Sequence, residues 1–377
     1  MARTVTWAQL RALAGFRTDK GCAISLYLNL DPSEAPTPGD LQTRMNALLS
    51  EAEKTDRSQL AHDAREGLKA DFDRIRRWFD DDFEREGAQG LAIFSAGLDN
   101  YWSTLMLPAG VPDGVRVGRD FHLSPLVPLV ARSDGTIVAV VSREQGQLYR
   151  LGGGRLQVIA DESDEVPGQH DQGGWSQARY QRHIDKLVHE HLKGVAEELD
   201  RSRRRMHSPK IVLVCSEEMR SGFTEELSNE ARDALVGWTQ AEAHASPADL
   251  LAAVTPVLEE AQAKDESEAI GRWREELGRK GRAVSGWAPT LEAASDGRVD
   301  VLLFQEGSDR PAYRCPACGR ASLDAGSCPL DGTQLEQVEA GLDLAVHQTL
   351  AHGGAIWAIR HHDDLGPVEG IGALLRY

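Results

Sequence analysis

The middle of the chain places one long amphipathic stretch between two strand-length apolar runs. TIVAVV at 136–141 and IVLVCS at 211–216 are short, apolar and rich in β-branched residues, which is typical of buried strands. Between these runs, apolar residues recur at helical spacing: Ile184, Leu187, Val188, Leu192, Val195, Ala196 and Leu199. A strand, a long helix and a second strand in this order favour a sheet covered by helices, so we expect an α/β fold.

This alternation continues through all 377 residues, which exceed the size of a single typical core. We expect three mixed α/β domains, a first over 1–125, a middle domain over 126–268 and a third over 269–377. The third is expected to carry an inserted cysteine-containing unit at about 310–335.

Four local patterns set further expectations. A long helical stretch is expected over 39–79, and SPLVPLVA at 124–131 has the length of a strand. The glycines at 152–154 lie between two strand candidates and predict a hairpin turn rather than a phosphate-binding loop. EAIGRWREELGRKG at 268–281 is expected to form a separate helix that opens the third domain.

Composition narrows the class of protein. The formal net charge of −17 argues against indiscriminate nucleic-acid binding, and no partner DNA is expected, so any RNA contact must rest on a local basic patch. No apolar run reaches the length of a membrane helix, and the N-terminus does not resemble a signal peptide. An odd number of cysteines suits a reducing compartment. We therefore expect a cytoplasmic protein with no membrane partner.

QGGWSQARYQRH at 172–183 precedes the amphipathic stretch and concentrates positive charge. A helix N-terminus favours phosphate, because its free N–H groups and dipole are positive. A basic helical face can also be simply solvated, and two glycines can be a plain flexible turn. We take the segment as an RNA-facing surface. Together with the helix and the basic patch that follow, the segment supplies the candidate RNA-binding residues Arg179, Arg182, Lys186, Arg203, Arg204 and Arg205.

CPACGRASLDAGSCPLDG at 315–332 has the spacing of a metal site. A Cys-x2-Cys pair next to proline and glycine turns both sulfur atoms to one point, and the second half repeats this pattern with aspartate as its last ligand. The candidate ligands of a structural zinc ion are Cys315, Cys318, Cys328 and Asp331. The alternative is a degenerate ribbon that has lost its metal. Cys22 and Cys215 stand in apolar, strand-like contexts and are expected in the core.

The segment from Gly173 onward resembles the middle domain of archaeal and eukaryotic class-1 peptide release factors. In that family a GGQ loop is followed by serine, arginine and an aromatic residue, and here Ser176, Arg179 and Tyr180 match these. ISLYLNLDP resembles the first strand of the family's N-terminal domain, and VDVLLFQEG and VEGIGALLRY resemble its C-terminal domain. The archaeal members carry a small zinc ribbon where the cysteine unit stands. The chain is therefore identified as a member of the bacterial branch of the release factor and Pelota superfamily.

The chain departs from the family at the position that matters most for chemistry. Trp175 occupies the place of the glutamine, which in the family helps water attack the peptidyl-tRNA ester. An indole cannot act as both donor and acceptor as an amide does, but it can stack on a base. The first domain also lacks the family's stop-codon reading motifs, so stop-codon-dependent termination is not expected.

The resemblance implies two functions of different classes. In the first, the chain binds the ribosomal A site as a monomer and contacts ribosomal RNA and the tRNA acceptor end, in ribosome hibernation or rescue. In the second, it is a peptidyl-tRNA hydrolase whose loop amides and Gln177 position the water. The candidate catalytic residues are Gly173, Gly174, Trp175 and Gln177. A third hypothesis is an α/β protein that has kept the fold but no longer acts in translation.

Overall fold

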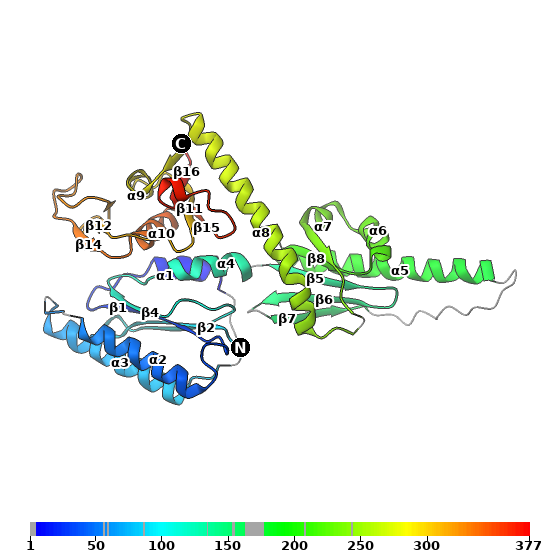
Figure 1. Ribbon diagram of the computed structural model, residues 1–377, viewed down its shortest axis with the longest axis horizontal. Coiled ribbons are helices and arrows are strands. Elements are labelled where there is room, and N and C mark those ends of the chain that lie inside the picture. Colours follow the sequence, from blue (N-terminus) through cyan, green and yellow to red (C-terminus); the bar gives the residue numbers. More distant parts are fainter. Residues whose placement is uncertain are drawn as a thin grey trace. The chain divides into compact units, whose positions relative to one another are not determined.

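The computed structural model describes residues 5–377 except 56, 59, 86, 134, 153–154, 163–176, 207–208 and 243, and only the backbone of 131–133 and 177–182. The chain divides into two compact units (Figure 1). One unit contains Met1–Arg132 with Ala263–Tyr377, and the other is Ser133–Gln262. Both contain sheets and helices, which confirms the predicted α/β class. The division into three domains stays a prediction.

The N-terminal part of the first unit is an antiparallel sheet in the order β3-β2-β1-β4 with helices on both faces. β1 is buried almost throughout because Ile24, Leu26 and Leu28 face α2 and α3, while Ala23 and Tyr27 face the opposite side. The elements are α1 (Trp7–Ala14), β1 (Ala23–Asn29), α2 (Pro38–Lys54), α3 (His62–Asp81), β2 (Gly90–Ala96), β3 (Tyr101–Leu107), β4 (Gly114–Gly118) and α4 (Val127–Ser133).

Two expectations for this part are wrong. The single helical stretch over 39–79 is two helices, α2 and α3, separated between Lys54 and His62. The stretch at 124–131 is not a strand but a 3-10 turn, Ser124–Leu126, followed by α4. Pro125 stands at the start of this turn, where a fixed φ and a missing N–H are tolerated. An unbroken apolar run has no period, so the sequence alone could not separate strand from helix here.

The C-terminal part of the first unit is a mixed sheet in the order β10-β16-β11-β15, in which only β11 and β15 run parallel. A small antiparallel sheet, β13-β12-β14, is inserted between β11 and α10. The elements are β10 (Ala283–Ser285), α9 (Trp287–Ser295), β11 (Val299–Gln305), β12 (Ala312–Arg314), β13 (Ala321–Ser322), β14 (Glu336–Val338), α10 (Gly341–Ala351), β15 (Ala355–Ile359) and β16 (Ile371–Leu375).

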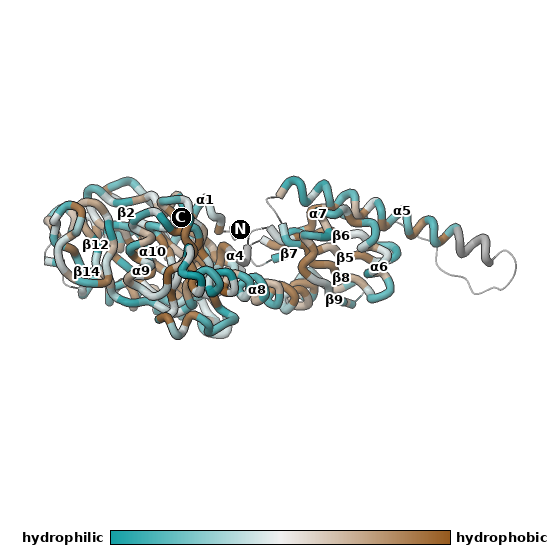
Figure 2. The backbone as a smooth tube through the Cα atoms, turned by 90° about the horizontal axis from the view of Figure 1, so that it is seen from above, coloured by the Kyte–Doolittle hydropathy of each residue, from teal (hydrophilic) through white to brown (hydrophobic). Residues whose placement is uncertain are grey.

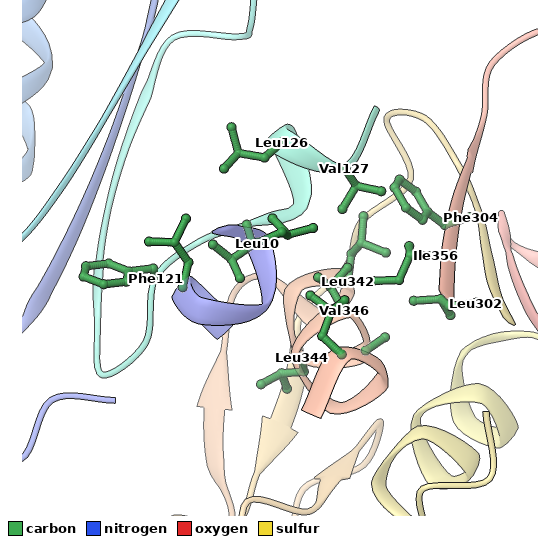
Figure 3. Packing of buried hydrophobic residues seen from close by; sticks show 14 of the residues in the cluster. Leu10, Phe121, Leu126, Val127, Leu302, Phe304, Leu342, Leu344, Val346 and Ile356 are labelled. Atoms are coloured by element: carbon green, nitrogen blue, oxygen red, sulfur yellow. The ribbon is translucent and has the colours of Figure 1, made fainter. Parts of the chain in front are cut away.

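One hydrophobic core joins the two parts of the first unit (Figure 3). Leu10 of α1 and Phe121, Leu126 and Val127 of the connecting segment belong to the same buried cluster as Val346 of α10. Because one core is shared, we expect these two parts to unfold together.

The second unit is a five-stranded sheet in the order β7-β6-β5-β8-β9, with α5, α6 and α7 on one face and α8 on the other. β5 and β8 are its central strands and are strongly apolar (Figure 2). β6 and β7 form the predicted hairpin. The elements are β5 (Thr136–Val141), β6 (Gly146–Gly152), β7 (Arg155–Asp161), α5 (Gln177–Arg204), β8 (Lys210–Val214), α6 (Glu217–Glu226), α7 (Asn229–Ala234), β9 (Leu235–Thr239) and α8 (Pro247–Gly278).

The separate helix expected at 268–281 is wrong, because these residues continue α8, which is 32 residues long. Leu250 and Val254 of α8 pack in the second unit, whereas Ile270 and Trp273 pack against the sheet of the first. The buried side changes along the helix, so no single apolar stripe marks it as one element. Among the described residues, no helix is long and apolar enough to cross a membrane.

Candidate functional site

The loop predicted to carry chemistry, Gly173, Gly174 and Trp175, lies outside the described residues. Gln177 is the first residue of α5, and Arg179 and Arg182 follow on the same helix. The side chains of these three residues are also outside the described set. The structure therefore describes the helix that follows the loop, but not the loop itself.

α5 is held by the apolar stripe predicted from its sequence. Ile184, Leu192 and Leu199 are buried, and the stripe packs against residues of β5, β6 and β8. The approach is close at Gly146 of β6, where a Cβ atom would lie 2.3 Å from a methyl group of Val195. A larger residue at Gly146 would force α5 away from the sheet.

The basic residues of α5 are partly balanced by acidic neighbours. Lys186 is exposed and lies 3.4 Å from Glu190. Near the end of the helix, Nε of Arg203 donates to Asp200 at 3.3 Å, and a guanidinium nitrogen of Arg204 lies 3.9 Å from the same carboxylate. Arg205 is exposed and makes no ion pair among the described residues. The patch thus has less net positive charge than its arginine count suggests.

The two halves of the cysteine unit form the same backbone turn. In the first, the amide of Gly319 donates to the carbonyl of Cys315 at 2.9 Å, and in the second Gly332 donates to Cys328 at 2.9 Å. Both glycines have positive φ, 79° and 74°, a conformation that other residues rarely adopt. CPLDG therefore forms the same backbone turn as the first half, although Asp331 stands where that half has Cys318.

These knuckles bring four ligand atoms together, all within 4.8 Å of one another. The sulfur of Cys315 lies 3.4 Å from an oxygen of Asp331, and the sulfurs of Cys318 and Cys328 are 3.5 Å apart. Ligand atoms around a tetrahedral zinc ion lie about 3.5–3.8 Å apart, so the arrangement fits such an ion. Hydrogen bonds from the backbone and side chain of Thr333 help to lower the pKa of Asp331, which keeps it an anionic donor.

The first knuckle is also held from outside. The side chain of Gln348, on α10, donates to the carbonyl of Gly319 at 2.8 Å, and Arg17 donates to the carbonyl of Pro316 at 3.4 Å. Arg314, which immediately precedes the knuckle, pairs with Asp120. The cysteine unit is therefore packed into the first unit rather than attached as a loose appendage.

Sequence reasoning missed a buried group of charges, the Asp343 cluster, formed by His122, Asp343, His347 and the amides of residues 123 and 124. Asp343 accepts hydrogen bonds from the amides of Leu123 and Ser124 at 2.6 and 3.1 Å. Its carboxylate also lies 3.3 Å from each of the two histidines. The spacing of Asp343 and His347, four residues apart on one helix, was the only local signal of this pair.

His347 holds together two segments that are distant in the sequence. Its ring nitrogens lie 3.2 Å from the carbonyl oxygen of Ala14 and 2.7 Å from that of Phe121. Carbonyl oxygens only accept, so the ring satisfies both of them only as an imidazolium, which donates from both nitrogens. Burial alone would lower the pKa of His347, but the Asp343 carboxylate and the hydrogen bond to the carbonyl of Phe121 raise it to about 9.

A cavity of about 680 Å³ lies in the first unit. Tyr27, Pro128 and Phe304 line it together with polar residues that include His122 and Asp309. Among the predicted site residues whose side chains are described, none lines this cavity. The cysteine unit and the cavity are thus separate places in the first unit.

Comparison with known proteins relates the chain to translation factors. Residues 122–259 match the family model described as bacterial archaeo-eukaryotic release factor family 10. Peptide chain release factor subunit 1 of Archaeoglobus fulgidus is 25% identical over 347 residues, covering 84% of this chain and 81% of its own length. The corresponding protein of Methanobrevibacter smithii is 25% identical over 53% of this chain and only 50% of its own length.

A solved structure described as a model of ribosome-bound archaeal Pelota and ABCE1 is also similar. It is 11% identical, covers 100% of this chain and 95% of its own, and has a TM-score of 0.40. At that TM-score the superposition carries no argument, so the relationship rests on the sequence matches.

Proposed function

Because the chain belongs to the bacterial branch of the archaeo-eukaryotic release factor superfamily, we propose that it is a translation factor that binds the ribosomal A site. The observation that carries the proposal is the family match over 122–259, which includes Gly173, Gly174 and Trp175 together with α5. In this proposal the loop is directed at the peptidyl-transferase centre, where it meets ribosomal RNA and the tRNA acceptor end.

The presence of Trp175 favours a factor that occupies the ribosomal A site over one that hydrolyses peptidyl-tRNA. An indole stacks on a nucleobase with a contribution of about 1–3 kcal/mol, whereas it lacks the paired donor and acceptor of glutamine. A factor that blocks the A site needs affinity and no hydrolysis. We therefore place the protein in hibernation or rescue of ribosomes.

The alternative function is hydrolysis of peptidyl-tRNA. Gln177 is favoured for this role because it begins α5, two residues after Trp175. An amide side chain there, with backbone N–H groups of the loop, would orient water and stabilise an oxyanion.

Co-sedimentation with bacterial 70S ribosomes, vacant or loaded with peptidyl-tRNA, separates these functions when peptide release is scored in the same tubes. Binding without release supports occupation of the A site. Binding with release that Gln177→Ala abolishes and Trp175→Ala leaves intact supports the hydrolase. If the chain binds neither the vacant nor the loaded ribosome, both proposed functions are wrong.

The basic end of α5 is proposed to contact ribosomal RNA, through Arg203, Arg204 and Arg205. Reversing all three to Glu should weaken ribosome binding and flatten its salt dependence, because fewer counterions are released on binding. A matched control is reversal of Arg272, near the end of α8, and of Arg279 and Lys280, which directly follow that helix; all three are exposed. Equal losses in the two triple variants would mean that only total charge matters.

We also propose that Cys315, Cys318, Cys328 and Asp331 hold one structural zinc ion. The ion would clamp the two knuckles and take no part in a reaction. Metal analysis of the purified chain should find one zinc per molecule, and Cys318→Ser should lose it. Cys215→Ser, a change at a buried cysteine outside the unit, is the control that should retain zinc.

A further inference from the structure

The cysteine unit is contacted from outside at two backbone carbonyls of its first knuckle. Arg17, which lies between α1 and β1, donates to the carbonyl of Pro316 at 3.4 Å. Gln348, on α10, donates to the carbonyl of Gly319 at 2.8 Å. Both donors are half-buried, and neither belongs to the stretch that supplies the four ligand atoms. Two segments that are distant in the sequence therefore meet at one turn of the unit.

The carbonyl that accepts from Arg17 belongs to a peptide group directed at a ligand sulfur. This peptide group joins Pro316 to Ala317, and the amide of Ala317 donates to the sulfur of Cys315. The C=O and the N–H of a trans peptide group point in opposite directions, and no peptide bond among the described residues is cis. A donor outside the knuckle therefore fixes an N–H that points at the sulfur inside it.

Gln348 holds a second peptide group in the same way. The carbonyl of Gly319 shares its peptide group with the amide of Arg320, which donates to the sulfur of Cys318. Hydrogen bonds in a chain polarise one another, so a carbonyl that accepts makes the N–H of its own peptide group a stronger donor. A stronger bond from N–H to sulfur stabilises the thiolate, which is the form of cysteine that binds a metal. The two outside donors thus act on two different ligand sulfurs.

We propose that Arg17 and Gln348 are positioning residues of the metal site, so that two side chains outside the cysteine unit help to set its affinity for zinc. This inference rests on the proposed zinc site. Groups that orient metal ligands change metal affinity by about 10–100-fold when they are removed. Arg17 also acts through its charge, because three thiolates and one carboxylate around a divalent ion leave the site negative.

Zinc affinity of the full chain, measured by competition with a chromophoric chelator, tests the proposal. Gln348→Leu should lower the affinity by about tenfold or more. Arg17→Leu should lower it by less, because its bond to the knuckle is the longer one, and Arg17→Lys should restore most of the loss, because it keeps a charged donor. The matched controls are Gln337→Leu, at an exposed glutamine of β14, and Arg11→Leu, at an exposed arginine of α1, and both should keep the native affinity.

Cobalt(II) in place of zinc separates positioning from a loss of folding. Weakening a bond from N–H to a ligand sulfur raises the energy of the sulfur lone pairs. The sulfur-to-cobalt charge-transfer band of the Gln348→Leu variant should therefore move to longer wavelength than in the native chain. A band that disappears instead would show that Gln348 only keeps the knuckle folded, which overturns its role as a positioning residue.

The two proposals fail in different ways. A native chain that binds no zinc would refute the zinc site and, with it, this inference. A native chain that binds zinc, with equal affinities and unshifted bands in the Arg17→Leu and Gln348→Leu variants, would leave the zinc site standing and refute the role of these two side chains.

Discussion

The cysteine unit and the Asp343 cluster each bring several polar groups within a few ångströms, yet they are built in opposite ways. The four ligand atoms of the cysteine unit come from one stretch of 17 residues, Cys315 to Asp331, and two of the four residues are exposed. Asp343 is mostly buried, with its side chain 13% exposed, and its bond to the amide of Leu123 spans 220 residues of sequence. Local turns build the first, whereas only tertiary packing builds the second.

This difference predicts how much the loss of one residue from each group should destabilise the first unit. The knuckles are backbone turns, so the loss of one ligand should leave the rest of the first unit folded. The Asp343 cluster ties the end of α1 and the 121–124 segment to α10, inside the core that both parts share. Loss of one member leaves buried partners without compensation, which is costly.

The largest effect is expected for Asp343→Ala. The change leaves a buried imidazolium and two amides without their acceptor, and should destabilise the first unit by about 3–5 kcal/mol. Calorimetry of the full chain measures this as a lower Tm of one transition. Glu339→Ala is the control, because that carboxylate is 81% exposed in its pair with Arg116 and should contribute under about 1 kcal/mol. Equal effects of the two changes would show that the cluster does not hold the unit together.

The next effect is a pH dependence of the stability of the first unit that comes from His347. The folded-state pKa of His347, about 9, lies above its ordinary value of 6.5, so folding favours the protonated ring. Its stabilisation is complete below about pH 6.5 and is lost as pH rises through 9, by on the order of 3 kcal/mol, because one pKa unit corresponds to about 1.4 kcal/mol. Chemical unfolding between pH 6 and pH 10 should show this loss in the native chain. His347→Gln should be less stable at pH 6 and show a flatter profile, and parallel profiles would contradict the assignment.

The smallest effect on folding is expected at Asp331. With zinc saturating, Asp331→Cys should change the stability of the unit by less than about 1 kcal/mol, while completing an all-sulfur site that binds zinc at least about tenfold more tightly. Asp331→Ala should weaken zinc binding. Competition with a chromophoric chelator measures both. Asp324→Ala, an exposed carboxylate of the same unit outside the ligand set, should leave the affinity unchanged.

Periodic patterns predicted the fold well where one face of an element meets one neighbour. The apolar stripe of α5 correctly predicted both the helix and its buried side, because α5 packs on a single sheet. The sequence pattern predicted separate helices where the structure has the single helix α8. The two ends of α8 pack against different sheets, so its apolar residues change sides along the helix. The candidate sites show the same contrast. The spacing of the cysteines predicted that Cys315, Cys318, Cys328 and Asp331 lie together, whereas no spacing in the sequence predicted that His122 lies beside Asp343.

The sequence by itself determined the α/β class, the knuckle turns and the family relationship, because each depends on residues that are near one another along the chain. The tertiary structure alone decided that the two ends of the chain share a core and a buried charge cluster. It also decided that β7 is the outermost strand of its sheet among the described residues. These features depend on contacts between distant segments, and a linear pattern carries no record of which segments will meet.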